Sequence, residues 1–184
     1  ATVLVDGLKT GNNLYLSGTI SKIIVEKTYI GTMHLGVSAG KQCIPSDLIM
    51  LTTTGTVDAS SAANVAWASS STVTVVSGIL LLGEELGASS VMNQSGGIVT
   101  VSGWTKAATD IWNMTGGTTN WNSGSSGTDA FLATTVTTLN IYAGTFSTVA
   151  NVTAQVGFTT INQYGGTLNL QSSFANVEID GVYT

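Results

Sequence analysis

The acidic residues are the side chains with the clearest potential for chemistry, because two carboxyl groups about 5–9.5 Å apart can hydrolyse a glycosidic bond. Glu84 and Glu85 are adjacent, so on a strand they would point to opposite faces. Asp110 and Asp129 would meet only through loops, and the repeat positions equivalent to Asp58 are not acidic. The chain also contains no arginine, a residue suited to binding acidic substrates. We therefore predict that the protein is not an enzyme.

Histidine and cysteine each occur once, as His34 and Cys43. Nothing around them matches a nucleophile motif, and together they cannot supply a structural zinc site. The glycine pairs at 116–117 and 165–166 do not open helices, so they are not dinucleotide-binding loops. We predict no catalytic residue, no metal and no cofactor. Cys43 is expected to be a buried small apolar residue or, alternatively, a free or intermolecularly linked thiol.

The composition argues against several classes of protein. Only 8% of the residues are charged, against about 25% in a typical soluble domain, and the net charge is −5. A protein that binds nucleic acid needs a basic surface, so nucleic acid is not expected as a partner. The mean hydropathy is +0.34, but no apolar run approaches the ~18–20 residues of a membrane span. At 184 residues, one domain with one core is expected.

A short pattern that recurs along most of the chain indicates the elements that position these residues. An apolar residue is followed five positions later by a glycine, and further apolar residues follow the glycine at alternate positions. The glycines recur every 19 to 27 residues, about 22 on average, a period typical of a solenoid. They are Gly55, Gly78, Gly97, Gly117, Gly144 and Gly166.

The apolar residues alternate on both sides of each glycine, which is the period of a β-strand. Their parity changes across the glycine, and a strand changes face in this way only at a corner or bulge. Each repeat is therefore predicted to be a strand, a glycine corner, a second strand and a variable return loop. Stacking these units gives an all-β, single-domain parallel β-helix with the six glycines along one corner. A β-sandwich or jelly roll is the alternative architecture.

Four asparagines share one position, four residues before a glycine, and are expected to point outward or to sit at a corner. Stacked coils would place them about 4.8 Å apart, close enough for a ladder of hydrogen-bonded amides. The alternative is that asparagine is simply common in turns. The four residues are Asn93, Asn113, Asn140 and Asn162.

The four tryptophans divide into two groups. Trp112 and Trp121 fall on predicted core positions of the repeat. Trp67 and Trp104 lie outside the phased strands, so they either pack under a return loop or stack on a sugar.

The segments 92–101 and 161–170, which read MNQSGGIVTV and INQYGGTLNL, resemble coils of right-handed parallel β-helix proteins. That group includes virus decoration and tailspike-like proteins, autotransporter passenger domains and pectin-lyase-like enzymes. The resemblance covers roughly residues 49–170. It implies the architecture but not one function, because the fold hosts many unrelated activities.

The two ends of the chain do not keep the glycine phase. Solenoid ends expose a core layer and strand edges, so their terminal units are usually atypical caps. We predict an N-terminal cap with irregular strands at residues 1–48, β-helix coils at 49–170 and a C-terminal cap at 171–184. The N-terminal segment holds four of the five lysines. Its charged residues are the candidates for contact with a larger assembly: Lys22, Glu26, Lys27 and Lys41.

Strict alternation breaks in two apolar segments, at 49–51 and 79–82. The outward positions of these strands would be apolar as well as the inward ones, and an exposed apolar patch on a soluble protein marks an interface. Side-by-side β-helices can each bury one long face around a three-fold axis, so we expect a homotrimer. The candidate interface residues are Ile49, Leu51, Ile79 and Leu81.

Two classes of function remain for a compact scaffold with little chemistry. The first is a structural protein of a virion surface, such as a capsid decoration (cement) protein or a short fibre protein of a tailed phage. It would stabilise the shell by binding the major capsid protein or another virion protein. The second is a bacterial cell-surface or secreted adhesin, a β-helix module that binds a glycan. The sequence starts without a secretory signal, which favours a virion location over an extracellular or cell-surface one.

Overall fold

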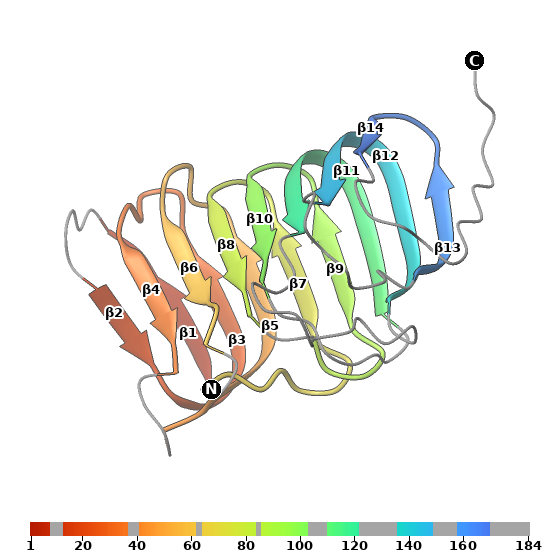
Figure 1. Cartoon of the computed structure of the whole chain (residues 1–184). Coiled ribbons are helices and arrows are strands. Elements are labelled where there is room, and N and C mark those ends of the chain that lie inside the picture. Colours follow the sequence, from red (N-terminus) through yellow and green to blue (C-terminus); the bar gives the residue numbers. More distant parts are fainter. Residues whose placement is uncertain are drawn as a thin grey trace.

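The computed structural model shows a chain whose described residues form β-strands and no helix, with every strand pair parallel (Figure 1). The structure describes residues 1–7, 13–36, 41–61, 64–83, 86–102, 110–121, 136–148 and 158–169. The strands are β1 (Thr2–Val5), β2 (Asn13–Leu16), β3 (Gly18–Val25), β4 (Thr32–Leu35), β5 (Cys43–Met50), β6 (Thr56–Ala59), β7 (Thr72–Val75), β8 (Ile79–Leu82), β9 (Val91–Gln94), β10 (Ile98–Val101), β11 (Asp110–Trp121), β12 (Val136–Thr148), β13 (Phe158–Gln163) and β14 (Thr167–Asn169). Within this part of the chain, no helix is long and apolar enough to cross a membrane.

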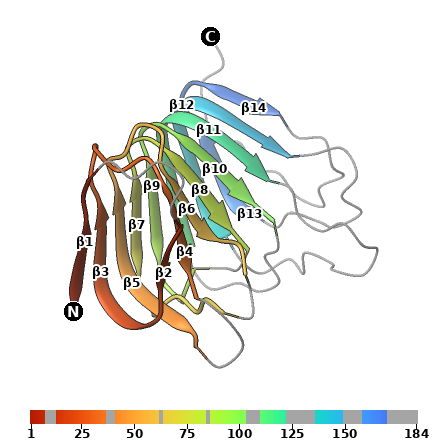
Figure 2. The ribbon, with the colours of Figure 1, turned by 90° about the vertical axis from the view of Figure 1, so that its left-hand side faces the viewer.

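The strands form two rows that meet at a corner (Figure 2). The first row contains β1, β3, β5, β7 and β9, and the second contains β2, β4, β6, β8 and β10, so each coil adds one strand to each row. β11 and β12 pass through the corner and join the rows into one 14-stranded sheet, and β13 and β14 both pair with β12. This arrangement is a parallel β-solenoid, which confirms the predicted fold class. Parallel pairing throughout excludes the alternative β-sandwich.

The spacing of the glycines in the sequence matches the register of the strands in the second row. The residues that directly follow the phased glycines are aligned with one another from coil to coil: Thr56, Ile79, Ile98, Thr118, Thr145 and Thr167. Each glycine corner therefore lies against the next, and a Cβ added to Gly97 would lie 2.6 Å from the carbonyl oxygen of Gly78. Five of the six glycines have positive φ, between 67° and 90°: Gly78, Gly97, Gly117, Gly144 and Gly166. Glycine adopts this conformation without the steric cost that a Cβ imposes.

In one early coil, the strand register of the first row differs from the register that the glycine spacing predicts. Met50 lies five residues before its glycine, yet it is aligned with Val75 and not with Val73. The corner of this coil contains more residues. A hydrogen bond of 2.8 Å, donated by the backbone N–H of Gly55 to the buried hydroxyl of Thr52, closes it. Met50 still points inward, since the shift is an even number of residues.

The inward positions of both rows form one apolar core. The wall residues on either side of the glycines are almost completely buried: Val57, Val73, Leu80, Met92, Val99, Trp112, Leu139, Phe146 and Ile161. Trp112, Trp121 and Phe146 pack against one another, with ring centroids 5.7–6.0 Å apart. Trp67 is also buried, so it packs in the core and offers no surface to a sugar. Trp104 lies outside the described residues.

The solenoid begins before the predicted boundary at residue 49. β1, β3 and β5 pair in register along the first row, and β2, β4 and β6 do so along the second. The described part of residues 1–48 therefore belongs to the coils and is not an irregular cap. Gly31 precedes β4 as Gly55 precedes β6, but the residue five positions before Gly31 is the charged Glu26, which hides the repeat. The predicted C-terminal cap, 171–184, lies outside the described residues.

Candidate interaction surfaces

The outward face of the second row carries an apolar patch in the middle of the solenoid. Ile79 and Leu81 alternate on β8 with the buried Leu80 and Leu82, so both point outward. Ile98 on β10 is aligned with Ile79 and is 42% exposed. We call Ile79, Leu81 and Ile98 the apolar strip. Neither strand contains a charged residue, so the face that β8 and β10 form is uncharged.

The other two predicted interface residues lie elsewhere. Ile49 points outward from β5 in the first row, where it is aligned with Ile24 and, one coil further, with Leu4. Leu51 follows β5 at the corner. The structure therefore brings Ile79 and Leu81 together, but it separates them from Ile49 and Leu51, because the two rows face different directions.

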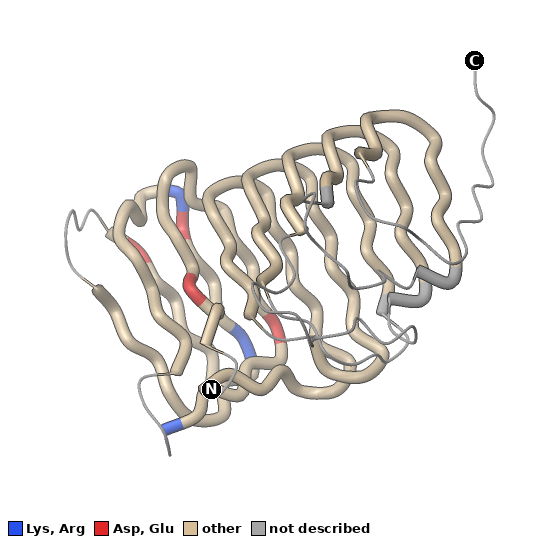
Figure 3. Tube along the Cα trace, viewed as in Figure 1, with Lys and Arg blue, Asp and Glu red and all other residues tan. Residues whose placement is uncertain are grey.

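Charged residues gather on the N-terminal coils (Figure 3). Only one described residue after residue 58 is charged. Among the four predicted assembly contacts, Lys22 points outward from β3 and forms an ion pair with Asp47 over 3.8 Å. Glu26 and Lys27 follow β3 at the corner, whereas Lys41 is exposed just before β5. These residues belong to the same end of the solenoid, but they do not form a single cluster.

Four outward amides form a ladder along the first row. The asparagines are aligned in register on β9, β11, β12 and β13. Each side-chain amide donates a hydrogen bond to the side-chain oxygen of the asparagine in the previous coil, over 3.0, 2.8 and 2.9 Å in turn. The donors are Asn113, Asn140 and Asn162, and the first acceptor is Asn93. Because these amides bond to one another, the ladder stabilises the stack.

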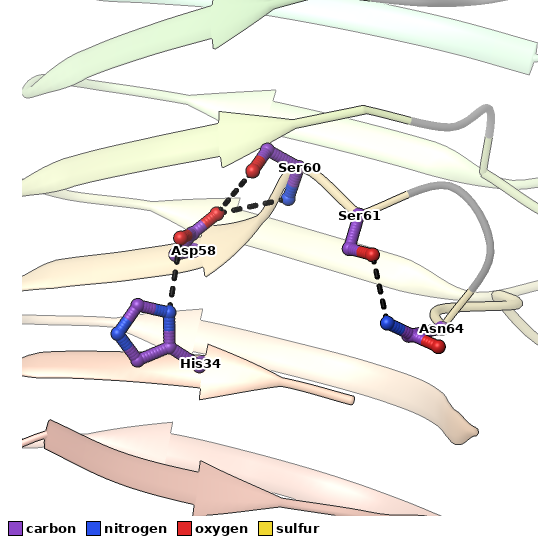
Figure 4. Close-up of polar contacts among 5 residues, drawn as sticks. All are labelled: His34, Asp58, Ser60, Ser61 and Asn64. Carbon is purple, nitrogen blue, oxygen red and sulfur yellow. Dashed lines mark hydrogen bonds and ion pairs between the residues drawn. The ribbon is translucent and has the colours of Figure 1, made fainter. Parts of the chain in front are cut away.

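A polar cluster that sequence reasoning missed crosses the first coils of the second row. Tyr15, His34 and Asp58 are aligned on β2, β4 and β6. The His34 ring stacks on Tyr15 with centroids 4.9 Å apart, and its Nδ1 lies 3.0 Å from Asp58 Oδ2. Asp58 also accepts hydrogen bonds from the backbone N–H of Ser60 (3.0 Å) and from its hydroxyl (2.5 Å) (Figure 4). The one available signal was the separation of His34 and Asp58 by 24 residues, close to the repeat.

The cluster holds a carboxylate and a serine hydroxyl, but the hydroxyl is not arranged as a nucleophile. Burial alone would raise the pKa of Asp58, but the hydrogen bonds from Ser60 and the neighbouring His34 outweigh burial and lower this pKa below its ordinary value. The Ser60 hydroxyl donates to Asp58 and not to His34, so the order of a Ser–His–Asp triad is not present. Among the described residues, no group of three or more His, Cys, Asp or Glu side chains is placed to hold a metal ion. We interpret the cluster as a polar link between adjacent coils.

The other residues considered for chemistry do not come together in the described part of the chain. Cys43 is a buried free thiol on β5, and burial raises its pKa to about 11. His34 points outward from β4, so the two do not form a catalytic pair. Three of the acidic residues considered above lie outside the described residues: Glu84, Glu85 and Asp129. The possible meeting of Asp110 with Asp129 therefore also lies outside them.

Two exposed tyrosines stack near the corner of the C-terminal coils. Tyr142 and Tyr164 are 49% and 60% exposed, and their rings lie 4.8 Å apart and nearly parallel. Asn140 and Asn162 of the ladder precede them by two residues, on the same strands or directly before the same corner. Aromatic rings beside amide groups are a combination that suits a polar ligand with apolar faces, such as a sugar. Both tyrosines stand two residues before a phased glycine, Gly144 and Gly166, so the repeat held a signal that sequence reasoning missed.

Comparison with known proteins assigns no family to the chain. No protein-family model, no curated protein and no solved structure matches it. The function therefore has to follow from the surfaces described above.

Proposed function

We propose that this protein is a non-enzymatic structural component of a virion surface: a capsid decoration (cement) protein or a short fibre protein of a tailed phage that stabilises the shell. The observation that carries the proposal is that the outward polar groups bind one another. The ladder amides are joined over 2.8–3.0 Å, and His34 is joined to Asp58. A surface whose functional groups are occupied within the protein suits a scaffold better than a catalyst.

The apolar strip supports self-association as a homotrimer. Its three side chains lie on adjacent coils of one face, and the strands that carry them are uncharged. Burying such a strip against another copy removes apolar surface from water. Three solenoids packed side by side around a three-fold axis would each bury this strip.

The charged N-terminal coils are the proposed contact with the major capsid protein or another virion protein. Lys27 and Lys41 are exposed and available to an acidic partner surface. Lys22 is already paired with Asp47, so it should contribute less to such a contact. Because exposed ion pairs are weak and screened by salt, binding at this end should weaken as ionic strength rises.

A bacterial cell-surface or secreted glycan-binding module is the second candidate, and the exposed tyrosine pair favours it. Tyr142 and Tyr164 offer aromatic surface next to the amides of the ladder. Under this alternative, Tyr164→Ala should abolish retention of the chain on a glycan array. Variants of the apolar strip should leave that retention unchanged.

Immunogold labelling separates the two candidates. An antibody raised against the purified chain would be applied to cultures that produce the protein. Gold on virus particles is the result expected from our proposal. Gold confined to cell envelopes would refute it and support the glycan-binding module.

Multi-angle light scattering tests the homotrimer. Leu81→Asp places a charge in the apolar strip and should convert the trimer to smaller species. Ser147→Asp is the matched control, because Ser147 also points outward from the second row but lies on β12, away from the strip. A monomeric wild-type chain, or equal behaviour of the two variants, would contradict the proposed trimer interface.

A further inference from the structure

The stacked tyrosines belong to a column of residues at the corner of the solenoid. Both lie two residues before a phased glycine, and the same position in the two preceding coils holds Ser95 and Thr115. The Tyr142 ring stacks on Tyr164 of the following coil, with an angle of 10° between the ring planes. The opposite face of the Tyr142 ring is therefore turned toward the preceding coil, where the column holds the small side chain of Thr115. Because β11 and β12 are both described, this ring face lies within the stack and not at an end of it.

This face of the Tyr142 ring is open. Tyr142 is 49% exposed although Tyr164 covers one of its two faces. Thr115 is itself exposed and does not cover the other face. Tyr164 holds the Tyr142 ring in a fixed orientation, so the open face is a rigid apolar platform at the corner.

The amide ladder runs beside the corner column and supplies polar groups in a fixed orientation. Asn113 lies two residues before Thr115 on β11, on the same outward face. Its amide donates a hydrogen bond to Asn93 over 3.0 Å and accepts one from Asn140 over 2.8 Å. An asparagine amide has two N–H donors and two acceptor lone pairs. One donor and one lone pair of Asn113 are therefore not used by the ladder.

The platform and the amide together fit a sugar ring. A pyranose with equatorial hydroxyl groups has C–H groups on both faces and hydroxyl groups around its rim. Each hydroxyl both donates and accepts hydrogen bonds, which matches the remaining donor and acceptor of Asn113. Asn113 and Thr115 are about 7 Å apart along the strand, so a sugar that lies over Thr115 against the Tyr142 ring brings its rim to Asn113.

Charge selects among such sugars. Asp110, at the start of β11, is the only charged residue that the structure describes after residue 58. The described residues of these coils therefore offer no cation to an acidic sugar, and the net charge of −5 repels one. The surroundings of the Tyr142 ring favour a neutral sugar over a uronic acid.

We propose that Tyr142, Thr115 and Asn113 form a binding site for a neutral pyranose with equatorial hydroxyl groups, of which a β-glucoside is the simplest example. The proposal rests on the glycan-binding role given above to the tyrosine pair, and it names the ligand and the residues that select it. The site can serve a virion protein or a cell-surface module equally. One sugar ring makes few contacts, so the expected Kd is on the order of 1 mM.

An NMR titration of the whole chain with methyl β-D-glucopyranoside tests the site. In the wild type, the side-chain amide of Asn113 and the backbone amide of Thr115 should show saturable shifts. The methyl glucuronide, which carries a carboxylate on the same ring, should bind at least about tenfold more weakly. Tyr142→Phe keeps the ring and should keep the affinity within about twofold, whereas Tyr142→Ala should weaken binding at least about tenfold.

A matched pair of variants keeps the test valid if Tyr142→Ala disturbs the corner. Thr115→Glu places a charged side chain in front of the open ring face and leaves both tyrosines in place. It should weaken binding at least about tenfold. Val76→Glu is the control, because Val76 holds the same position before its glycine and is 41% exposed, but lies three coils before Tyr142. Circular dichroism checks that both variants are folded.

Several results would overturn the inference. They are the absence of a saturable shift at Asn113 and Thr115, equal binding of the glucuronide, unchanged binding in Tyr142→Ala or Thr115→Glu, and equal loss in Thr115→Glu and Val76→Glu. Immunogold labelling is read independently of the titration. A failure of sugar binding therefore leaves the virion proposal standing, and gold confined to cell envelopes leaves the sugar site standing.

Discussion

Replacing Gly117 with alanine tests whether the glycine column sets the spacing of the coils. Gly117 has a φ of +81°, in the left-handed region, which costs an L-residue roughly 1–2 kcal/mol. A Cβ at this position would also lie 2.5 Å from the carbonyl oxygen of Gly96 and 2.7 Å from that of Gly97, in the preceding coil. Backbone atoms held in a sheet ladder cannot move aside as a flexible side chain can, so the coils would have to separate locally.

Gly18 provides a matched control for the backbone conformation. Its φ is +88°, close to that of Gly117, but an added Cβ would meet no atom within 4 Å. Gly18→Ala should therefore lower the free energy of unfolding by only the conformational cost, roughly 1–2 kcal/mol. Overpacking adds about 1–3 kcal/mol at Gly117. We expect Gly117→Ala to be the more destabilising variant by about 2 kcal/mol.

Urea unfolding followed by tryptophan fluorescence measures both changes. Trp112 and Trp121 lie on the same strand as Gly117 and are buried, so their emission reports loss of the core. For a chain of this size, the expected difference corresponds to a Tm about 4–8 °C lower than that of the control. Equal losses in the two variants would show that only the backbone conformation matters. That result would refute the view that glycine is required for the approach of neighbouring corners.

Three further predictions concern single side chains. Asn140→Ala breaks two ladder hydrogen bonds and should lower the free energy of unfolding in urea by about 2 kcal/mol. Asn169→Ala breaks one exposed hydrogen bond of 3.3 Å and should lower it by less than about 1 kcal/mol. Equal losses in the two variants would contradict a cooperative ladder. The lowered pKa of Asp58 stabilises the fold above the ordinary carboxyl pKa of 3.8, and this stabilisation is lost as pH falls through the folded-state value. The stability difference between wild type and Asp58→Asn should therefore shrink between about pH 5 and about pH 3, and a constant difference would show that the charge plays no part. Burial and a pKa of about 11 should keep Cys43 unreactive toward a thiol reagent at pH ~8 until urea unfolds the chain, so rapid labelling of the native protein would contradict its placement in the core.

The core of the solenoid could be predicted because every coil needs apolar residues at the same inward positions. Val57, Leu80 and Val99 occupy one inward column, and their spacing in the sequence identifies them without knowledge of the fold. The glycine spacing aligned Met50 with Val73, which is wrong, because the corner of that coil is longer. The error left the core prediction intact, since a shift of two residues returns a strand side chain to the same face.

The outward contacts followed from the sequence only where one residue type recurred. The asparagines were visible as a column because four identical residues share one phase. Tyr15, His34 and Asp58 are three different residue types, so their alignment appears only once β2, β4 and β6 are known to be neighbours. The repeat in the N-terminal coils was also missed, because the charged Glu26 stands five residues before Gly31, where the pattern expects an apolar residue.

The outward column that follows the glycines shows which residue types the strands need at this position. This column contains threonine in five coils and isoleucine in two: Thr32, Thr56, Thr118, Thr145 and Thr167, against Ile79 and Ile98. Threonine shows that a β-branched residue with a hydroxyl satisfies the strand at this position. The two isoleucines therefore add exposed apolar surface that strand formation does not need, and they do so on adjacent coils beside Leu81. That placement is the reason why we propose the apolar strip, and not Ile49 or Leu51, as the surface for self-association.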